Sequence, residues 1–496
     1  MPDLKTLTAR TLKWNAIDRV SSQVLYAVVG VVLANILSKA DFGLVGVLLV
    51  FQAFATILID SGFGAALLRE KDPSEDDYST VFWFNLFVSL AVYILLFFSA
   101  PLIADIFDGD TRLIPLSKVM FLVFVINGLA IVQTNRLMKR MDVKMIAISN
   151  SLGLISGGIA GVWLALEGFG AWAMVWQNII MASVKTGVLW ATGGWLPKLR
   201  FSAASLKKIR AVGFSVFSSA LLNTISQNIY TFVIGIRYSI VSVGIYSQAD
   251  KWSKMGSASI SQILTSSFVP LLSGVQDSRS DFLRYLDKTG RFTSFILLPV
   301  MLGLTAIASP LFHLLFGNKW DAAIPLFQML TLRGIFIVYI SLFNNYLLAL
   351  GKSRHLIACE AVKDILIFLA ILSTIWFRSI DILVMGQLIS GILTWVVLLK
   401  VTAHGLDIPI RRLLLPLKIF LFPAIVMTTI AAAAGLITGS LASEAPQPAS
   451  SGMRILLNSL TIIVMVGIGV LSYLLLIRRI PELREASQWL LGRFRR

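Results

Sequence analysis

Apolar runs recur along the whole chain, and each is followed by a short polar connection. A run of about 20 apolar residues forms a helix long enough to cross the roughly 30 Å hydrocarbon core of a bilayer. The pattern predicts fourteen spanning helices, and the residue-by-residue alternation of a transmembrane β-barrel is absent from it. The predicted helices cover residues 13–37, 43–68, 81–105, 114–136, 145–167, 169–192, 212–236, 243–272, 292–316, 324–350, 356–377, 382–403, 414–437 and 455–477.

Composition and charge fit an all-α polytopic membrane protein. The 496 residues are 57% hydrophobic and 14% charged, yet the formal net charge is +17. If both termini are cytoplasmic, thirty of the 43 lysines and arginines fall on the cytoplasmic side. This asymmetry follows the positive-inside rule, so the excess charge requires no nucleic-acid partner. We expect a multi-pass membrane protein with both termini in the cytoplasm.

Reactive and metal-binding residues are sparse. The single cysteine, Cys359, excludes an intrachain disulfide, and the three histidines, His313, His355 and His404, are too scattered for a metal cluster. We therefore expect no metal and no cofactor. The N-terminus lacks the short apolar core and small-residue cleavage site of a signal peptide. We also expect a flexible external linker at 438–454 and a basic amphipathic tail at 482–496 on the cytoplasmic leaflet.

A short repeat suggests an internal duplication. Ser22-Gln23-Val24-Leu25-Tyr26 is echoed by Ser226-Gln227-Asn228-Ile229-Tyr230, and a glycine opens the next helix in each copy, Gly43 and Gly244. Secondary transporters are commonly built from such repeats, with the site at their interface. We predict two pseudo-symmetric six-helix bundles at 1–211 and 212–404, an added helix pair at 405–480, and the tail at 481–496.

Several predicted helices carry polar stripes. Charges embedded in a membrane helix cost on the order of 2.5–3.5 kcal/mol each by insertion scales, so they usually face a wet cavity or a partner. On residues 13–37 the stripe is Asn15, Asp18, Arg19, Ser22, Gln23, Tyr26 and Gly30, and on 243–272 it is Ser247, Asp250, Lys251, Lys254, Ser261, Gln262 and Thr265. Structural pairing, of Asp18 with Arg19 or of Asp250 with Lys254, is the alternative explanation.

The predicted cavity is cationic. Its basic residues outnumber its acidic residues, and arginine and lysine bind phosphate through charge and several N–H donors. An enclosed basic cavity with access from the lipid suits a phospholipid-like anion. The basic members are Arg19, Lys185, Arg237, Lys251, Lys254, Arg333 and Lys363, and the acidic members are Asp18, Asp60, Asp250, Glu360 and Asp364.

Two motifs near the N-terminus resemble the Wzx-type polysaccharide flippases of the multidrug/oligosaccharidyl-lipid/polysaccharide exporter superfamily. The first is Leu37-Ser38-Lys39-Ala40-Asp41-Phe42-Gly43-Leu44, and the second runs from Asp60-Ser61-Gly62-Phe63-Gly64 to Leu68-Arg69-Glu70. The resemblance implies transport of an undecaprenyl-pyrophosphate-linked oligosaccharide from the cytoplasmic to the periplasmic leaflet by alternating access, for lipopolysaccharide or exopolysaccharide synthesis. The expected partners are that substrate, membrane lipids, and a polysaccharide polymerase with its export machinery.

The resemblance also suggests roles for the polar residues. The pyrophosphate would be held by Arg19, Lys251, Lys254 and Arg333, and the sugar hydroxyls would contact Gln23, Tyr26, Asn223, Gln227 and Tyr230. Asp18, Asp60 or Asp250 would couple transport to protons or Na⁺, because burial in a medium of low dielectric lets a carboxylate titrate near neutral pH.

Other functions stay open. A lipid II flippase shares the expected features, whereas a cation-coupled drug exporter of the same superfamily would need an acidic cavity. A membrane glycosyltransferase or polymerase usually needs a sizeable periplasmic loop or a pair of carboxylates at the membrane surface. The longest external loop, 438–454, has a single acid, Glu444. We therefore expect a transporter and not an enzyme.

Overall fold

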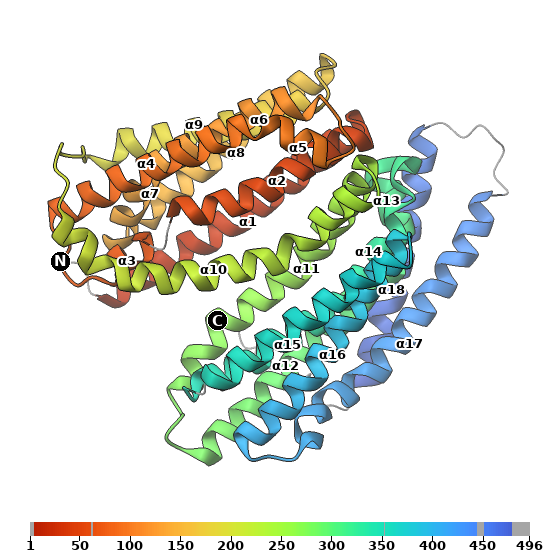
Figure 1. Ribbon diagram of the computed structural model, residues 1–496. Coiled ribbons are helices and arrows are strands. Elements are labelled where there is room, and N and C mark those ends of the chain that lie inside the picture. The colour runs from red at the N-terminus through yellow and green to blue at the C-terminus, as the bar shows by residue number, and fades with distance from the viewer. Residues whose placement is uncertain (1–3, 61–62, 352, 444–450, 479–496) are drawn as a thin grey trace. The chain divides into compact units, whose positions relative to one another are not determined.

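The computed structural model describes residues 4–60, 63–351, 353–443 and 451–478, and every regular element in these ranges is helical (Figure 1). The helices are α1 (Leu4–Ile36), α2 (Lys39–Asp60), α3 (Phe63–Arg69), α4 (Glu75–Phe98), α5 (Ala100–Ile106), α6 (Leu113–Met120), α7 (Leu122–Lys139), α8 (Val143–Leu166), α9 (Ala171–Gly193), α10 (Ala203–Arg237), α11 (Ile240–Ser273), α12 (Arg279–Ala306), α13 (Ala308–Phe316), η1 (Gly317–Trp320), α14 (Ala323–Ala349), α15 (Ser353–Leu372), η2 (Ser373–Ile375), α16 (Ile380–Leu406), α17 (Ile410–Ser443) and α18 (Ser451–Ile477).

The predicted all-α membrane fold is confirmed. Each of the fourteen predicted ranges falls on helical elements. Nine match a single long helix, and five cover two elements each: α2 with α3, α4 with α5, α6 with α7, α12 with α13, and α15 with η2. Ten helical segments among the described residues are long and apolar enough to cross a bilayer. The long helices outside that group are α9, α10, α11 and α15. Of these, α11 carries a predicted polar stripe, and α10 carries the predicted sugar contacts Asn223, Gln227 and Tyr230.

Some helices begin earlier than hydropathy predicts. The α10 helix starts at Ala203, where the Ser202 side chain accepts a hydrogen bond from the Ser205 N–H. In the same way, Ser278 caps α12 by accepting from the Asp281 N–H. Such caps satisfy backbone N–H groups at a helix start, and hydropathy detects only the apolar part that follows. The middle of the predicted linker 438–454, the tail 482–496 and the His355 side chain lie outside the described residues.

The chain forms two compact units, Met1–Ser247 and Gln248–Arg496. In the first unit α8 packs on α9 and α1, α7 packs on α4 and α9, and α10 packs on α2. In the second, α14 packs on α16, α12 on α17, and α17 on α18. The division at 211 and 404 into six-helix bundles stays a prediction.

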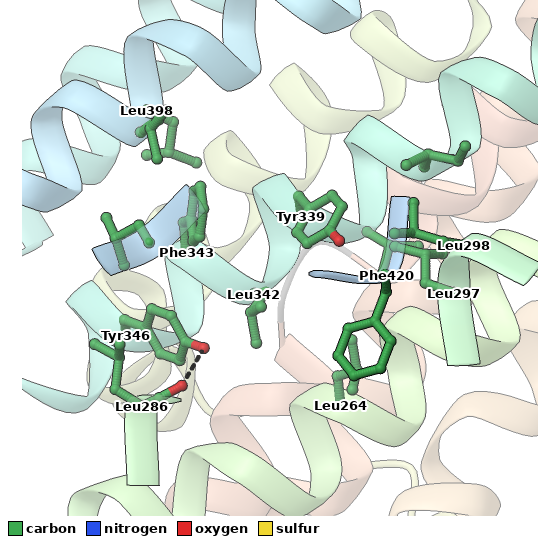
Figure 2. Close-up of a cluster of buried hydrophobic side chains, with 14 of the residues drawn as sticks. Leu264, Leu286, Leu297, Leu298, Tyr339, Leu342, Phe343, Tyr346, Leu398 and Phe420 are labelled. Atoms are coloured by element: carbon green, nitrogen blue, oxygen red, sulfur yellow. Dashed lines mark hydrogen bonds between the residues drawn. The ribbon is translucent and has the colours of Figure 1, made fainter. Parts of the chain in front are cut away.

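The core of the second unit joins α11, α12 and α14 to α18 (Figure 2). Tyr346 on α14 is 1% exposed, and its hydroxyl donates to the Leu286 carbonyl of α12 at 3.2 Å. Phe420 of α17 and Leu398 of α16 are fully buried in the same cluster. These contacts fix the framework from which α14 presents Arg333.

Candidate functional site

The polar turn before α2 caps two helix starts. Asp41 Oδ2 accepts from the Ser38 N–H at 2.9 Å, and the Asp41 N–H donates to Ser38 Oγ at 3.1 Å. This reciprocal pair is a capping box. Asp41 Oδ1 accepts from the N–H of Ala171, the first residue of α9, at 3.0 Å. The motif at residues 37–44 therefore positions the starts of α2 and α9 relative to each other.

The two glycines of the repeat pack against each other's helices. A Cβ on Gly43 would lie 1.8 Å from the Ile240 carbonyl oxygen, and one on Gly244 would lie 2.1 Å from the Lys39 carbonyl oxygen. Each glycine thus faces the residue four positions before the other glycine. The start of α2 and the start of α11 cross here with backbone against backbone, which only residues lacking a Cβ allow.

Asp60, the last residue of α2, contacts the start of α3. Its carboxylate accepts from the Gly64 N–H. A Cβ on Gly64 would lie 2.7 Å from both Asp60 Oδ1 and Asn135 Nδ2 of α7, so these groups are tightly packed. The position gives Asp60 a structural task in the second motif of the resemblance.

Asp18 lies in a polar cluster within the first unit. Its carboxylate accepts from Asn150 Nδ2 of α8 at 3.1 and 3.3 Å and from Ser22 Oγ at 3.4 Å. Lys185 of α9 interacts with Asp18 electrostatically. Three helices therefore bring an acid, an amide and an amine together, and we call Asp18, Asn150 and Lys185 the α1–α8–α9 cluster.

Glycines allow α8 to approach its neighbours at this cluster. Cβ atoms on Gly153 and Gly157 would each lie 2.7 Å from a backbone carbonyl oxygen of α9, and one on Gly158 would lie 2.6 Å from Val29 of α1. A Cβ on Gly161 would lie 2.9 Å from Gln177 Cβ of α9, so this glycine also serves close helix packing.

Arg19 differs from Asp18 in its surroundings. Its side chain is exposed, and among the described residues no ion pair joins it to Asp18. Neighbouring helical positions point about 100° apart, so one stripe divides into two rows. Tyr26 follows the row of Asp18, and its hydroxyl contacts Met181 Sδ of α9 at 3.5 Å. Gln23 follows the row of Arg19 and is half-buried.

The α10 residues are placed differently from one another. Asn223 and Gln227 are exposed and joined by a hydrogen bond of 3.2 Å from Gln227 Nε2 to Asn223 Oδ1. Tyr230, one turn further along, is 1% exposed and lies in the protein interior. Two of the three polar α10 positions therefore face out of the packed interior.

Charges on α11 are partly neutralised. Asp250 and Lys254 form an ion pair of 2.6 Å at the i, i+4 spacing, the contact that the structural alternative expects. Lys251 is half-buried, and its Nζ lies 5.5 Å from the centre of the Trp252 ring. Cation–π contact of this kind stabilises an ammonium without removing its charge.

Arg333 of α14 is held by an amide. Its Nη1 donates to Gln387 Oε1 of α16 at 3.2 Å, and Gly391 lets the arginine stem pack against α16. Gln387 is buried. Sequence reasoning missed Gln387 and Asn150 as partners. The sequence marks each of them as a polar amide near a glycine in an apolar helix. Asn150 precedes Gly153 of α8 by three residues, and Gln387 follows Gly386 of α16.

The fold is that of a known class of membrane transporters. The chain is similar in structure to the lipid II flippase MurJ in an inward closed conformation, with a TM-score of 0.72, 15% identity, and coverage of 94% of this chain and 99% of that chain. An inward-facing MATE family multidrug resistance transporter of the MOP superfamily gives a TM-score of 0.59 at 14% identity, with 77% and 95% covered. At these identities the similarity defines the fold alone.

A family model described as "Polysaccharide biosynthesis protein" matches residues 32–325. The model covers more than half of the chain, so the chain belongs to this family of polysaccharide biosynthesis proteins. The succinoglycan biosynthesis transport protein ExoT of Rhizobium meliloti (strain 1021) is 25% identical over 401 residues, which are 81% of this chain and 79% of that protein. The lipopolysaccharide biosynthesis protein WzxC of Escherichia coli (strain K12) is 27% identical over 346 residues, with 67% and 68% covered.

Proposed function

We propose that this protein flips an undecaprenyl-pyrophosphate-linked oligosaccharide from the cytoplasmic to the periplasmic leaflet of the inner membrane by alternating access. Arg19 and Lys251 carry the proposal as anion-binding groups. The observation that supports it most is the division of charge on α1, where Asp18 is engaged by Asn150 and the neighbouring guanidinium of Arg19 is exposed. A phosphate group is the natural ligand for a guanidinium with several free directions of donation.

The other predicted residues take secondary roles in the proposal. Arg333, supported by Gln387, is a further basic contact, and the Asp250–Lys254 pair contributes little net charge. Asn223 and Gln227 are exposed amides suited to sugar hydroxyls. Asp18 is the favoured ion-coupling residue, because it is half-buried and meets an amide, Asn150, and an amine, Lys185, from two other helices. Both termini would be cytoplasmic, and a polymerase would use the product.

Export in living cells tests the proposal. The variants Arg19→Ala and Lys251→Ala are expected to reach the membrane in normal amounts but to stop polymer export, while the lipid-linked oligosaccharide accumulates inside. Arg112→Ala is the matched control, because Arg112 is 59% exposed in a connecting turn and pairs with Asp110 at 2.6 Å. Normal export by both single variants and by the double variant would contradict the anion-binding role.

A further inference from the structure

The connection between α9 and α10, residues 194–202, has a fixed backbone. Trp83 Nε1 donates to the Lys198 carbonyl at 2.8 Å, the Lys198 N–H donates to Ser79 Oγ at 3.1 Å, and the Ser202 N–H donates to Thr80 Oγ1 at 3.0 Å. The connection therefore lies along the first turns of α4 and does not move independently of it.

Trp195 anchors the start of the connection. Its ring is 6% exposed, its Nε1 donates to Glu75 Oε2 at 2.6 Å, and its carbonyl accepts from Gln133 Nε2 of α7 at 2.8 Å. Arg136 of α7 stacks over the Trp195 ring at 5.1 Å. These contacts bury one side of the connection between α9 and α10.

The opposite side is strongly apolar. Leu196 is 76% exposed, Leu199 is 88% exposed and Phe201 is 58% exposed. Three large apolar side chains within six residues, presented by a fixed backbone, are far more than single surface hydrophobics of the ordinary kind. Such a surface marks a site of contact with a protein or a membrane.

Basic residues are interleaved with these apolar ones. Lys198 and Arg200 are exposed between Leu196 and Phe201. The nearby carboxylate of Glu75 accepts from Arg136 at 2.9 Å and from Trp195, and it also interacts electrostatically with Lys198. The exposed side of the connection therefore combines large apolar side chains with positive charge.

The neighbours of the connection place it near the membrane surface. It follows the end of α9 and lies against the start of α4, a helix apolar enough to span the membrane from Glu75 to Phe98. The rings of Trp83, Trp190 and Trp195 lie 5.3 to 6.0 Å from the Phe82 ring at the same place. Tryptophans gather where the hydrocarbon meets the headgroups.

We propose that residues 194–202 form an interfacial anchor that inserts Leu196, Leu199 and Phe201 into the leaflet and binds anionic phospholipid headgroups through Lys198 and Arg200. Anionic lipids attract basic residues next to a membrane span, and apolar side chains strengthen that attachment. The anchor fixes the first unit to the membrane surface at the point where the chain leaves α9, and it does not depend on the substrate that the protein transports.

Site-directed fluorescence on the full chain tests the anchor. Leu199→Cys is labelled with an environment-sensitive dye and reconstituted in vesicles of phosphatidylcholine alone or mixed with phosphatidylglycerol. Cys359 is buried, so the parent chain provides the labelling blank. Asp72→Cys, in the exposed turn between α3 and α4, is the control.

A nitroxide on the upper acyl chain of the lipid is expected to quench the label at 199 several-fold more than the label at 72, with the stronger quenching in the anionic mixture. Adding Lys198→Gln and Arg200→Gln should remove the difference between the two lipid compositions. A label at 199 that aqueous iodide quenches as readily as the label at 72 would overturn the anchor. So would a label shielded from both quenchers, since that result would mean that protein covers the surface. Equal quenching in both lipid compositions would overturn the headgroup assignment.

Discussion

The crossing of Gly43 and Gly244 gives the sharpest stability prediction. In Gly43→Ala the new Cβ would lie 1.8 Å from the Ile240 carbonyl oxygen and 2.6 Å from its carbon. Real Cβ contacts essentially never fall below 3.0 Å, so the helices must separate by more than about 1 Å. Because the obstructing atoms are backbone on both sides, no side-chain rotation relieves the clash.

The expected cost follows from two opposing effects. Overpacking of an interior typically costs about 1–3 kcal/mol, and the rigid contact here favours the upper end. Alanine gains about 1 kcal/mol over glycine in a helix. A net loss of about 2 kcal/mol remains, which corresponds to a fall in Tm of about 4–8 °C on the scaling for soluble domains of 150–250 residues.

Thermal unfolding of the purified protein, followed by tryptophan fluorescence, measures this loss. Gly187→Ala is the control, because Gly187 lies inside α9 with nothing within 4 Å of the added carbon. That variant should melt at the wild-type temperature or slightly above it. The double variant of Gly43 and Gly244 should lose less than the sum of the single losses, since one separation relieves both clashes. A Gly43→Ala protein that melts with the control, or a fully additive double variant, would refute the reasoning.

Three further predictions concern polar side chains. Asp18→Asn should preserve the Tm to within a few degrees but abolish the dependence of transport on the coupling ion. The assay compares substrate flipping with and without an imposed ion gradient. Unchanged gradient dependence would exclude Asp18 from coupling. Arg136→Ala should lower the Tm by the equivalent of about 2 kcal/mol. Arg136 is 8% exposed, and its guanidinium pairs with the half-exposed Glu75 and stacks on two aromatic rings, so the substitution removes all of these contacts. A melting curve like that of the wild type would contradict this. Arg333→Lys should reduce transport although it keeps the charge, because an ammonium cannot keep the planar donor geometry toward Gln387; full activity in the same flipping assay would argue against that contact.

The sequence predicts the helices well because apolar runs of membrane length leave few other structures. It also marks Gly43 and Gly244 as equivalent positions. It does not show that the two glycines meet, because that contact depends on how helices some 200 residues apart cross. The partner of Asp18 is missed for the same reason. Arg19 is the adjacent charge, whereas Asn150 is 132 positions away and is brought close by the glycines of α8.

The most direct test of the central claim is a flipping measurement with purified full-length protein in vesicles. The probe is an undecaprenyl-pyrophosphate-linked oligosaccharide with a fluorescent sugar, and a membrane-impermeant reductant reports which leaflet holds it. We predict that the protein makes the protected inner-leaflet probe accessible, and that Arg19→Ala and Lys251→Ala do not. Accessibility no faster than in protein-free vesicles, or unchanged in both variants, would contradict the proposed transport by a basic site.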